Sequence, residues 1–230
     1  MVGPIIQFSN VSKRFVKGKE TITIFDHLDL SIQAGDFVAI MGPSGSGKTT
    51  LLNLMGGLDQ ATEGQITFNG AAISGLSEGQ LAAWRAVNVG FIFQFYNLMP
   101  MLTAERNVEL PLLLTKLSGA ERRQRVQAAL ALVGLRERTG HYPREMSGGQ
   151  QQRVAIARGI ISDPKLLVCD EPTGDLDRAT ADEVLLMLQT LNQEMGKTIV
   201  MVTHDPAAAK YAHRILHLDK GAFTDRELAA

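Results

Sequence analysis

The octapeptide Gly42-Pro43-Ser44-Gly45-Ser46-Gly47-Lys48-Thr49 is the strongest indication of how this chain folds. It matches the pattern G-x-x-x-x-G-K-[ST] and lies between a continuous apolar run, Phe37–Met41, and a segment of helical character, Thr49–Gly57. A buried strand, a glycine-rich loop and a helix in this order let backbone N–H groups and the helix N-terminus converge on a phosphate. We therefore expect Lys48 to reach the β- and γ-phosphates of a nucleotide and the Thr49 hydroxyl to bind Mg²⁺. The residues assigned to the phosphates are Gly42, Pro43, Ser44, Gly45, Ser46, Gly47, Lys48, Thr49 and Thr50.

A second predicted strand ends in two adjacent carboxylates. The apolar run Leu166–Cys169 is followed directly by Asp170 and Glu171. Because side chains alternate along a strand, these two carboxylates leave it in different directions. One can hold Mg²⁺ through water while its neighbour polarises an attacking water as a general base. We assign the metal to Asp170 and the catalytic role to Glu171, and we interpret Cys169 as a small core residue without chemistry.

Length and composition exclude several classes of protein. The chain has 230 residues, of which 45% are hydrophobic, and a net charge of −1 from 23 basic and 24 acidic residues. This balance excludes disorder as the main state and argues against a dedicated nucleic-acid binder, which usually carries a basic surplus. The single cysteine cannot form an intramolecular disulfide. Neither a signal peptide nor an apolar run of about 18–20 residues is present, so we expect a soluble, cytosolic chain.

The pattern along the chain predicts an α/β core with a helical insertion. Predicted strands come first, at Ile5–Phe8, Ile22–Phe25, Leu28–Ile32, Phe37–Met41 and Gln65–Phe68. Helical periodicity follows at Glu78–Val87, Ala104–Leu117, Ala120–Val133 and Gln150–Ile161. Strands and helices then alternate, at Leu166–Cys169, Ala179–Met195, Thr198–Val202, Pro206–Tyr211 and Arg214–Leu218. We expect a single domain over residues 1–230, with a mainly helical subdomain near residues 95–160.

The segment Ser147-Gly148-Gly149-Gln150-Gln151-Gln152-Arg153 gives the chain a recognisable identity. It resembles the signature motif of the ATP-binding subunits of ABC transporters, with Met146 where the family more usually has Leu. The resemblance implies an ABC ATPase fold: an α/β P-loop NTPase core with a mixed, mainly parallel sheet, an antiparallel β subdomain, and a helical subdomain that carries the signature.

Four further motifs extend this resemblance over essentially the whole chain. Phe15 lies where the family places an aromatic ring on adenine, and Gln94 matches the glutamine that senses Mg²⁺ and the γ-phosphate and faces the membrane partner. Asp175-Leu176-Asp177 matches the D-loop, and His204 matches the switch histidine beside the γ-phosphate. The resemblance thus implies four catalytic residues, Lys48, Gln94, Glu171 and His204, and three metal ligands, Thr49, Gln94 and Asp170.

The same resemblance implies partners. Two copies are expected to enclose two ATP molecules head to tail, with Ser147, Gly149 and Gln150 of one copy completing the site of the other, and Asp175 of the D-loop is assigned to nucleotide binding. The segments Gly56–Asp59, Phe93–Leu98 and Thr103–Val108 look like those of the macrolide-export and lipoprotein-release (MacB/LolD) group. This group implies a separately encoded FtsX/MacB-like permease, a periplasmic adaptor bound through that permease, no nucleic acid, and a location at the cytoplasmic face of the inner membrane.

Two other functions remain open from the sequence. The first is a mechanotransmitting ATPase of an envelope or cell-division complex that transports no substrate. The second is a soluble ABC protein of DNA repair or translation, although such proteins usually carry paired ATPase domains or a long coiled-coil insertion.

Overall fold

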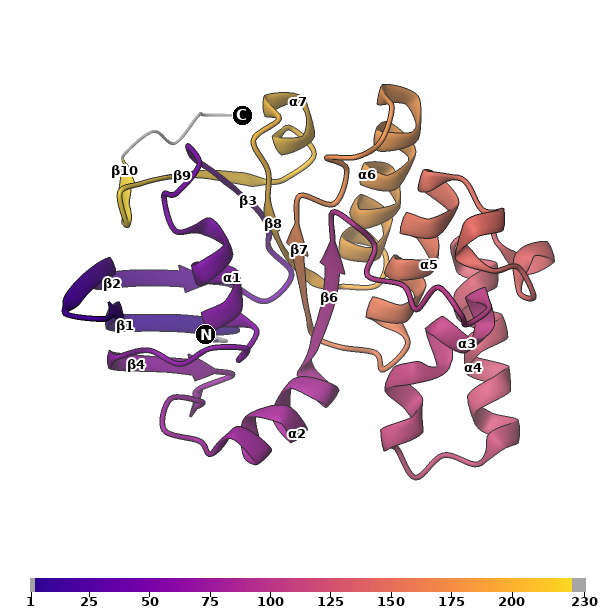
Figure 1. Cartoon of the computed structure of the whole chain (residues 1–230), viewed down its shortest axis with the longest axis horizontal. Coiled ribbons are helices and arrows are strands. Elements are labelled where there is room, and N and C mark those ends of the chain that lie inside the picture. The colour runs from indigo at the N-terminus through magenta and orange to yellow at the C-terminus, as the bar shows by residue number, and fades with distance from the viewer. Residues whose placement is uncertain (1–2, 225–230) are drawn as a thin grey trace.

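The centre of the molecule is a six-stranded mixed sheet. The computed structural model describes residues 3–224, and its strands lie in the order β10-β9-β3-β8-β7-β6 (Figure 1). Neighbouring strands are parallel except β9 and β10, which are antiparallel. Their bounds are β3 (Phe37–Met41), β6 (Val89–Phe93), β7 (Leu166–Asp170), β8 (Thr198–Val202), β9 (Arg214–Asp219) and β10 (Ala222–Thr224).

Both faces of this sheet are buried, which explains the continuous apolar runs of its strands. Along β3, Phe37 and Ala39 belong to one hydrophobic core, and Val38 and Ile40 belong to the other. The first core lies under the helices that follow β6 in the chain, and the second is shared with a smaller sheet. The strand period of two therefore places successive residues in different cores.

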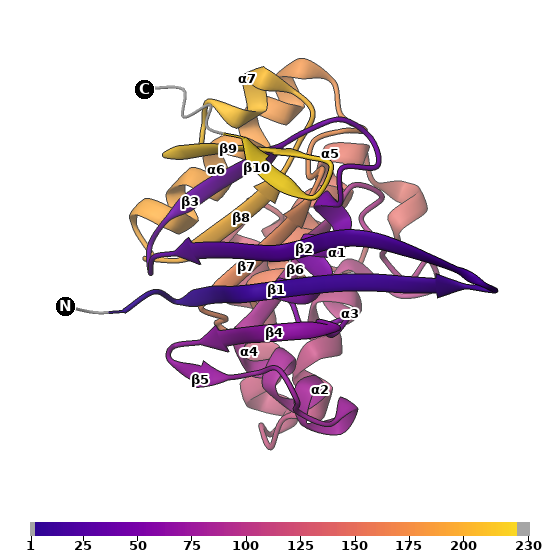
Figure 2. The same cartoon turned by 90° about the vertical axis from the view of Figure 1, so that its left-hand side faces the viewer.

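The smaller sheet is antiparallel, in the order β2-β1-β4-β5 (Figure 2). Its strands are β1 (Ile6–Lys17), β2 (Glu20–Ile32), β4 (Glu63–Phe68) and β5 (Ala71–Ala72). Helix α1 (Lys48–Met55) contributes four buried residues, Leu51, Leu52, Leu54 and Met55, to the core between the two sheets. Helix α1 is thereby anchored by its second half in the core between both sheets.

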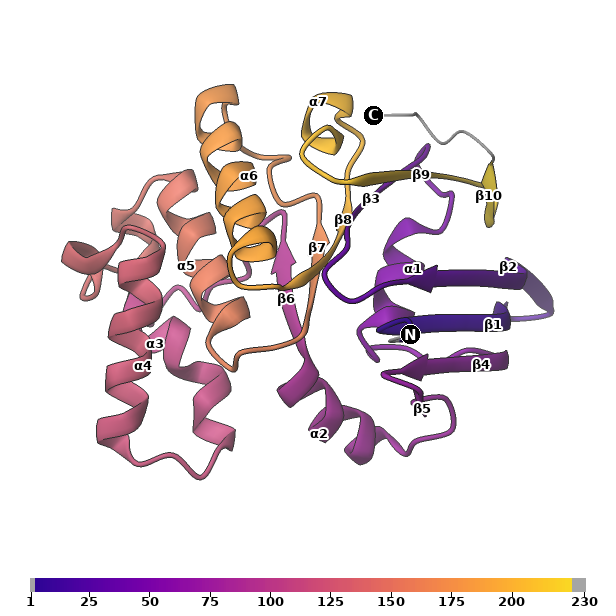
Figure 3. The same ribbon diagram turned by 180° about the vertical axis from the view of Figure 1, so that it is seen from behind.

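Helices cover the other face of the central sheet (Figure 3). They are α3 (Ala104–Glu109), α4 (Gly119–Leu132), α5 (Gly148–Ile160), α6 (Arg178–Gln193) and the short α7 (Pro206–Ala209), while α2 (Glu78–Asn88) leads into β6. Three 3₁₀ turns, Leu110–Leu114, Arg136–Arg138 and Pro143–Glu145, connect them. Among residues 3–224, every helix is too short or too polar to cross a bilayer.

Several segments differ from the sequence-based expectations: β5 and β10 were not predicted, and β1 extends to Lys17 rather than ending at Phe8. Strand β6 was not predicted, because it begins directly at the end of α2 without a glycine or proline between them. The helix expected over Ala104–Leu117 ends at Glu109, because Pro111 lacks an N–H and its ring clashes with an α-helical carbonyl. The runs Ile22–Phe25 and Leu28–Ile32 form one long strand, interrupted by register irregularities against β1.

Candidate nucleotide-binding site

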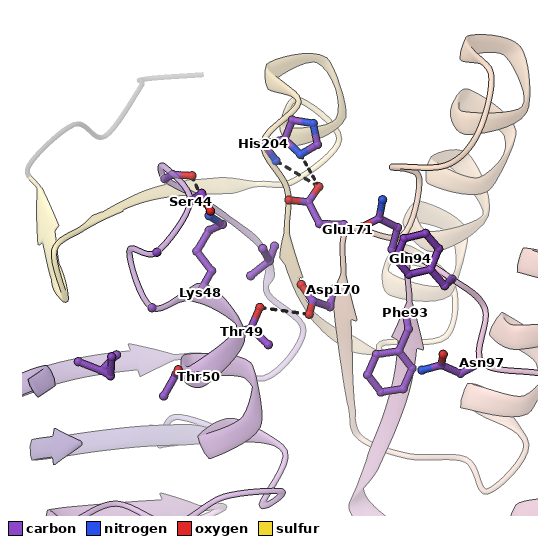
Figure 4. A pocket seen from close by; sticks show the side chains of 16 residues that line it. Ser44, Lys48, Thr49, Thr50, Phe93, Gln94, Asn97, Asp170, Glu171 and His204 are labelled. Atoms are coloured by element: carbon purple, nitrogen blue, oxygen red, sulfur yellow. Dashed lines mark hydrogen bonds and ion pairs between the residues drawn. The ribbon is translucent and has the colours of Figure 1, made fainter. Parts of the chain in front are cut away.

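The strands that carry the predicted motifs end side by side at one edge of the central sheet. The ends of β3, β7 and β8 lead into the phosphate loop, Glu171 and His204, respectively. Carboxyl ends of parallel strands are the usual place for a ligand in such sheets. A cleft of about 670 Å³ opens there (Figure 4). Its lining residues are Ile24, Gly42, Ser44, Gly45, Gly47, Lys48, Thr49, Thr50, Phe93, Gln94, Phe95, Asn97, Asp170, Glu171, Val202 and His204.

The phosphate loop leaves several donors available to an anion. Helix α1 begins after Gly47, whose φ of 103° favours glycine and which offers no side chain to cap the first turn. Lys48 Nζ donates to the carbonyls of Gly42 and Pro43 at 2.8 and 2.9 Å, so the third ammonium proton is free for a phosphate oxygen. The buried Ser46 hydroxyl has no protein partner within the described chain. These groups fit a polyphosphate.

Thr49 and Asp170 bring two oxygen ligands together across the cleft. The Thr49 hydroxyl donates to Asp170 Oδ2 at 3.3 Å (Figure 4). Burial raises the pKa of the Asp170 carboxyl and the nearby Glu171 charge raises it further, against the hydrogen bond from Thr49 and the charge of Lys48. Residues 3–224 contain no group of three or more His, Cys, Asp or Glu arranged to hold a metal. Hydroxyl and carboxylate oxygens completed by phosphates suit Mg²⁺, so these residues fit that ion.

Glu171 and His204 form a hydrogen-bonded pair at the mouth of the cleft. Glu171 Oε2 accepts from His204 Nδ1 at 2.8 Å and from the His204 backbone N–H at 3.4 Å (Figure 4). The Glu171 side chain is 17% exposed and that of His204 is 71% exposed. Glu171 has a φ of 50°, and its N–H donates to Val202 O at 3.0 Å. A non-glycine residue held in this conformation is strained, which is a common feature of functional sites.

Gln94 reaches the same cleft from the end of β6. Its side chain packs on Gly174, where a Cβ atom would lie only 3.0 Å from Gln94 Nε2. The fold therefore gathers Lys48, Thr49, Gln94, Asp170, Glu171 and His204 around one cleft.

The remaining predicted residues, which include Pro43 and Ser46 of the phosphate loop, lie outside the lining of this cleft. Phe15 is on β1, 41% exposed, with Lys13 Nζ 4.5 Å from its ring centroid. Ser147 caps α5 in a reciprocal pair of hydrogen bonds with Gln150. A Cβ atom on Gly149 would lie 2.2 Å from Thr180 Cγ2, so a glycine there lets α5 approach α6. Asp175 accepts a hydrogen bond from Tyr96 of the same chain.

Five lining residues were not predicted: Ile24, Phe93, Phe95, Asn97 and Val202. Four of them could have been found from their place in the sequence. Phe93, Phe95 and Asn97 lie near Gln94, and Val202 ends the predicted strand that precedes His204. No local signal marks Ile24, because it reaches the cleft from the separate antiparallel sheet.

Comparisons with known proteins agree on one family. The profile of a family described as ABC transporter matches residues 25–174. The chain is 46% identical to the uncharacterized ABC transporter ATP-binding protein YvrO of Bacillus subtilis, over 94% of each chain. It is 44% identical to the macrolide export ATP-binding/permease protein MacB of Marinobacter nauticus, over 96% of this chain and 34% of MacB. The ATP-binding cassette MJ0796 of Methanocaldococcus jannaschii, solved as a dimer in a post-hydrolysis state bound to ADP and Pi, superposes with a TM-score of 0.88. That match has 42% identity and covers 96% of this chain and 97% of MJ0796.

Proposed function

The chain belongs to the family of ABC transporter ATP-binding proteins, and from this premise we propose that it hydrolyses ATP to drive a separately encoded membrane permease. The permease driven in this way either exports a substrate or extracts a lipid or lipoprotein. The observation that carries the proposal is the convergence of Lys48, the adjacent pair Asp170 and Glu171, and His204 on one cleft from three separate segments.

Different residues of the cleft have different roles in phosphoryl transfer. The phosphate loop and Lys48 bind the β- and γ-phosphates and balance their charge. Mg²⁺, bound by Thr49 and Asp170 with Gln94 nearby, would neutralise negative charge on the phosphate oxygens. Glu171 orients the attacking water and accepts its proton. His204 Nδ1 donates to Glu171, since a carboxylate can only accept, and so holds the carboxylate in place.

A second copy of the chain completes each site in this proposal. Ser147, Gly149, Gln150 and Asp175 lie outside the cleft of their own chain, yet they resemble residues that contact nucleotide. A helix N-terminus such as that of α5 favours a γ-phosphate brought to it by another copy. The dimeric form of the related cassette MJ0796 supports this arrangement. Two ATP molecules then stabilise the closed dimer, and loss of the γ-phosphate removes the contacts that favour it.

The permease is proposed to contact a groove beside Gln94. This groove, of about 490 Å³, is lined mainly by apolar residues, and its polar lining residues are Arg85, Asn97, Arg158 and Ser162. Large exposed side chains lie on the segments around it: Phe95 is 69% exposed, Met101 77% and Leu114 84%. Apolar side chains gathered in this way mark interaction surfaces. The groove and the helical subdomain near residues 95–160 would transmit opening and closing of the dimer to an FtsX/MacB-like partner, which holds the chain at the cytoplasmic face of the inner membrane.

Affinity purification of the Glu171→Gln variant from detergent-solubilised membranes, with ATP present, tests this function. Gln keeps the shape of Glu171 but cannot accept a proton, so hydrolysis should stop while ATP and the closed dimer persist. Capture of a permease with a large extracytoplasmic domain, lost when Met101 and Leu114 are replaced by Ser, supports a transporter. Envelope hydrolases captured without a periplasmic adaptor favour the mechanotransmitting alternative. Soluble ribosomal or repair partners, or Mg·ATP hydrolysis by Glu171→Gln at the wild-type rate, contradict the proposal.

A further inference from the structure

The backbone just after Gln94 adopts an unusual conformation. Tyr96 and Asn97 have φ values of 59° and 50°, and neither is a glycine. Two consecutive residues in the left-handed region are costly, so surrounding contacts must hold them. One guanidinium does this: Arg158 of α5 donates from Nη2 to Tyr96 O at 2.7 Å and from Nη1 to Asn97 O at 2.6 Å. The bend is thereby tied to the helix that begins with the signature.

The bend directs the Tyr96 side chain away from the nucleotide cleft and toward the 174–175 loop. The Tyr96 ring is buried, and its hydroxyl donates to Asp175 Oδ2 at 3.2 Å. Burial raises the pKa of Tyr96, and the Asp175 carboxylate raises it further, so the hydroxyl keeps the proton that it donates. The residues in contact are separated by 79 positions in the sequence.

Two close approaches bring the same segments together. A Cβ atom on Gly148, at the start of α5, would lie 2.8 Å from the Tyr96 hydroxyl oxygen. A Cβ atom on Gly174 would lie 3.0 Å from Gln94 Nε2. The Gln94 and Tyr96 side chains are therefore packed directly against backbone atoms of Gly174 and Gly148. A small displacement of the 174–175 loop must then move both side chains, because no free space separates these segments.

We propose that Tyr96 is a positioning residue of the ATPase site, whose hydroxyl links the segment carrying Gln94 to Asp175. Tyr96 does not line the cleft; it acts through Gln94, which does. Since Asp175 is proposed to lie near the site of the second copy, the hydrogen bond makes the position of Gln94 depend on contact between copies. This inference rests on the proposed function, because it assigns Gln94 to the reaction.

A second tyrosine provides a matched control. The Tyr211 hydroxyl donates to Asp182 Oδ1 at 3.0 Å, on the surface of α6 and outside the cleft lining. Tyr96→Phe and Tyr211→Phe therefore remove the same group from the same kind of acceptor. Only Tyr96→Phe removes a hydrogen bond of the segment that carries Gln94, so only this variant is expected to affect that segment.

The test combines steady-state ATP hydrolysis with hydrogen exchange of the full chain. We expect Tyr96→Phe to lower kcat about tenfold, as the loss of a hydrogen bond to a charged acceptor does, with KM for ATP within twofold of wild type. Backbone exchange should rise over residues 94–98. Tyr211→Phe should leave kcat, KM and exchange over residues 94–98 unchanged. In an Asp175→Ala background, Tyr96→Phe should change kcat by less than twofold, because its partner is already absent.

Three outcomes overturn the proposal. One is a kcat of Tyr96→Phe within twofold of wild type. Another is an equal loss of kcat in both tyrosine variants, which would indicate a general structural effect. If the wild-type chain hydrolyses no Mg·ATP, the proposed function fails, and exchange alone then decides the inference: unchanged exchange over residues 94–98 in Tyr96→Phe overturns it, and a rise confined to that variant supports the link.

Discussion

Replacement of Asn107 tests whether the surface proposed to meet the permease is held by a single buried amide. Asn107 of α3 is fully buried. Its Oδ1 accepts the Met99 N–H at 2.7 Å, and its Nδ2 donates to the carbonyls of Met99, Leu102 and Thr103 at 3.1, 3.0 and 3.1 Å. The side chain therefore ties the exposed 99–103 loop to the helix that follows it.

The magnitude follows from the number of bonds that the amide can make. Nδ2 has two protons for three carbonyls, so with the Met99 N–H the side chain makes about three full hydrogen bonds. At roughly 1 kcal/mol each, Asn107→Ala should lower the free energy of unfolding by about 3 kcal/mol. This is a large share of a total that is typically about 5–15 kcal/mol. Asn107→Asp keeps the acceptor but directs a carboxylate at three carbonyls, so it should cost more at pH 7 and less as the pH falls and the group is protonated.

Urea denaturation followed by the fluorescence of Trp84, the one tryptophan in the sequence, measures this loss. Limited chymotrypsin cleavage reports on the loop separately, and Asn107→Ala should expose bonds within residues 97–103. Asn192→Ala is the matched control, because Asn192 Nδ2 donates to Gly35 O and Lys197 O, both at 2.8 Å, elsewhere in the fold. It should be destabilising while the loop stays protected. A cost below about 1 kcal/mol for Asn107→Ala, or equal cleavage in both variants, would refute the reasoning.

Three other substitutions test the site and its support. Lys48→Ala should weaken ATP binding about 10- to 100-fold by calorimetry, because it removes a charged donor to the phosphates; unchanged affinity would contradict the assignment. Ser147→Arg should preserve ATP binding by one copy but prevent ATP-driven dimerisation in sedimentation, whereas Ser118→Arg, which breaks the equivalent capping box of α4, should dimerise normally. Hydrogen bonds from Arg122 and Arg106 hold the pKa of Glu109 below its ordinary value despite burial. The stability gained is present above the unfolded pKa and is lost as the pH falls through the native pKa. Glu109→Gln should therefore lower the free energy of unfolding by about 2 kcal/mol in urea denaturation at pH 7. The difference from wild type should shrink below about pH 4, where the Glu109 carboxylate is protonated. A difference that does not depend on pH would show that the ion pairs of Glu109 are not its source.

Much of the fold could be predicted because its signals are local. Strands buried on both faces appear as continuous apolar runs, as in Phe37–Met41 and Leu166–Cys169. Strand β6 was missed because no glycine or proline separates it from α2, and its packing partners lie far away in the chain. A Cβ atom on Gly90 would lie 2.1 Å from Gly159 O, so this glycine serves close packing against α5, which no neighbouring residue in the sequence indicates.

Residue types at fixed short spacing are enough to identify the phosphate loop, the paired carboxylates and the family. Tertiary structure alone decided that Ile24 lines the cleft, that His204 pairs with Glu171, and that Tyr96 reaches Asp175. The physical reason is the sheet: parallel pairing brings the ends of strands far apart in the chain to one edge. Distances across that edge depend on packing between elements, which local patterns do not encode.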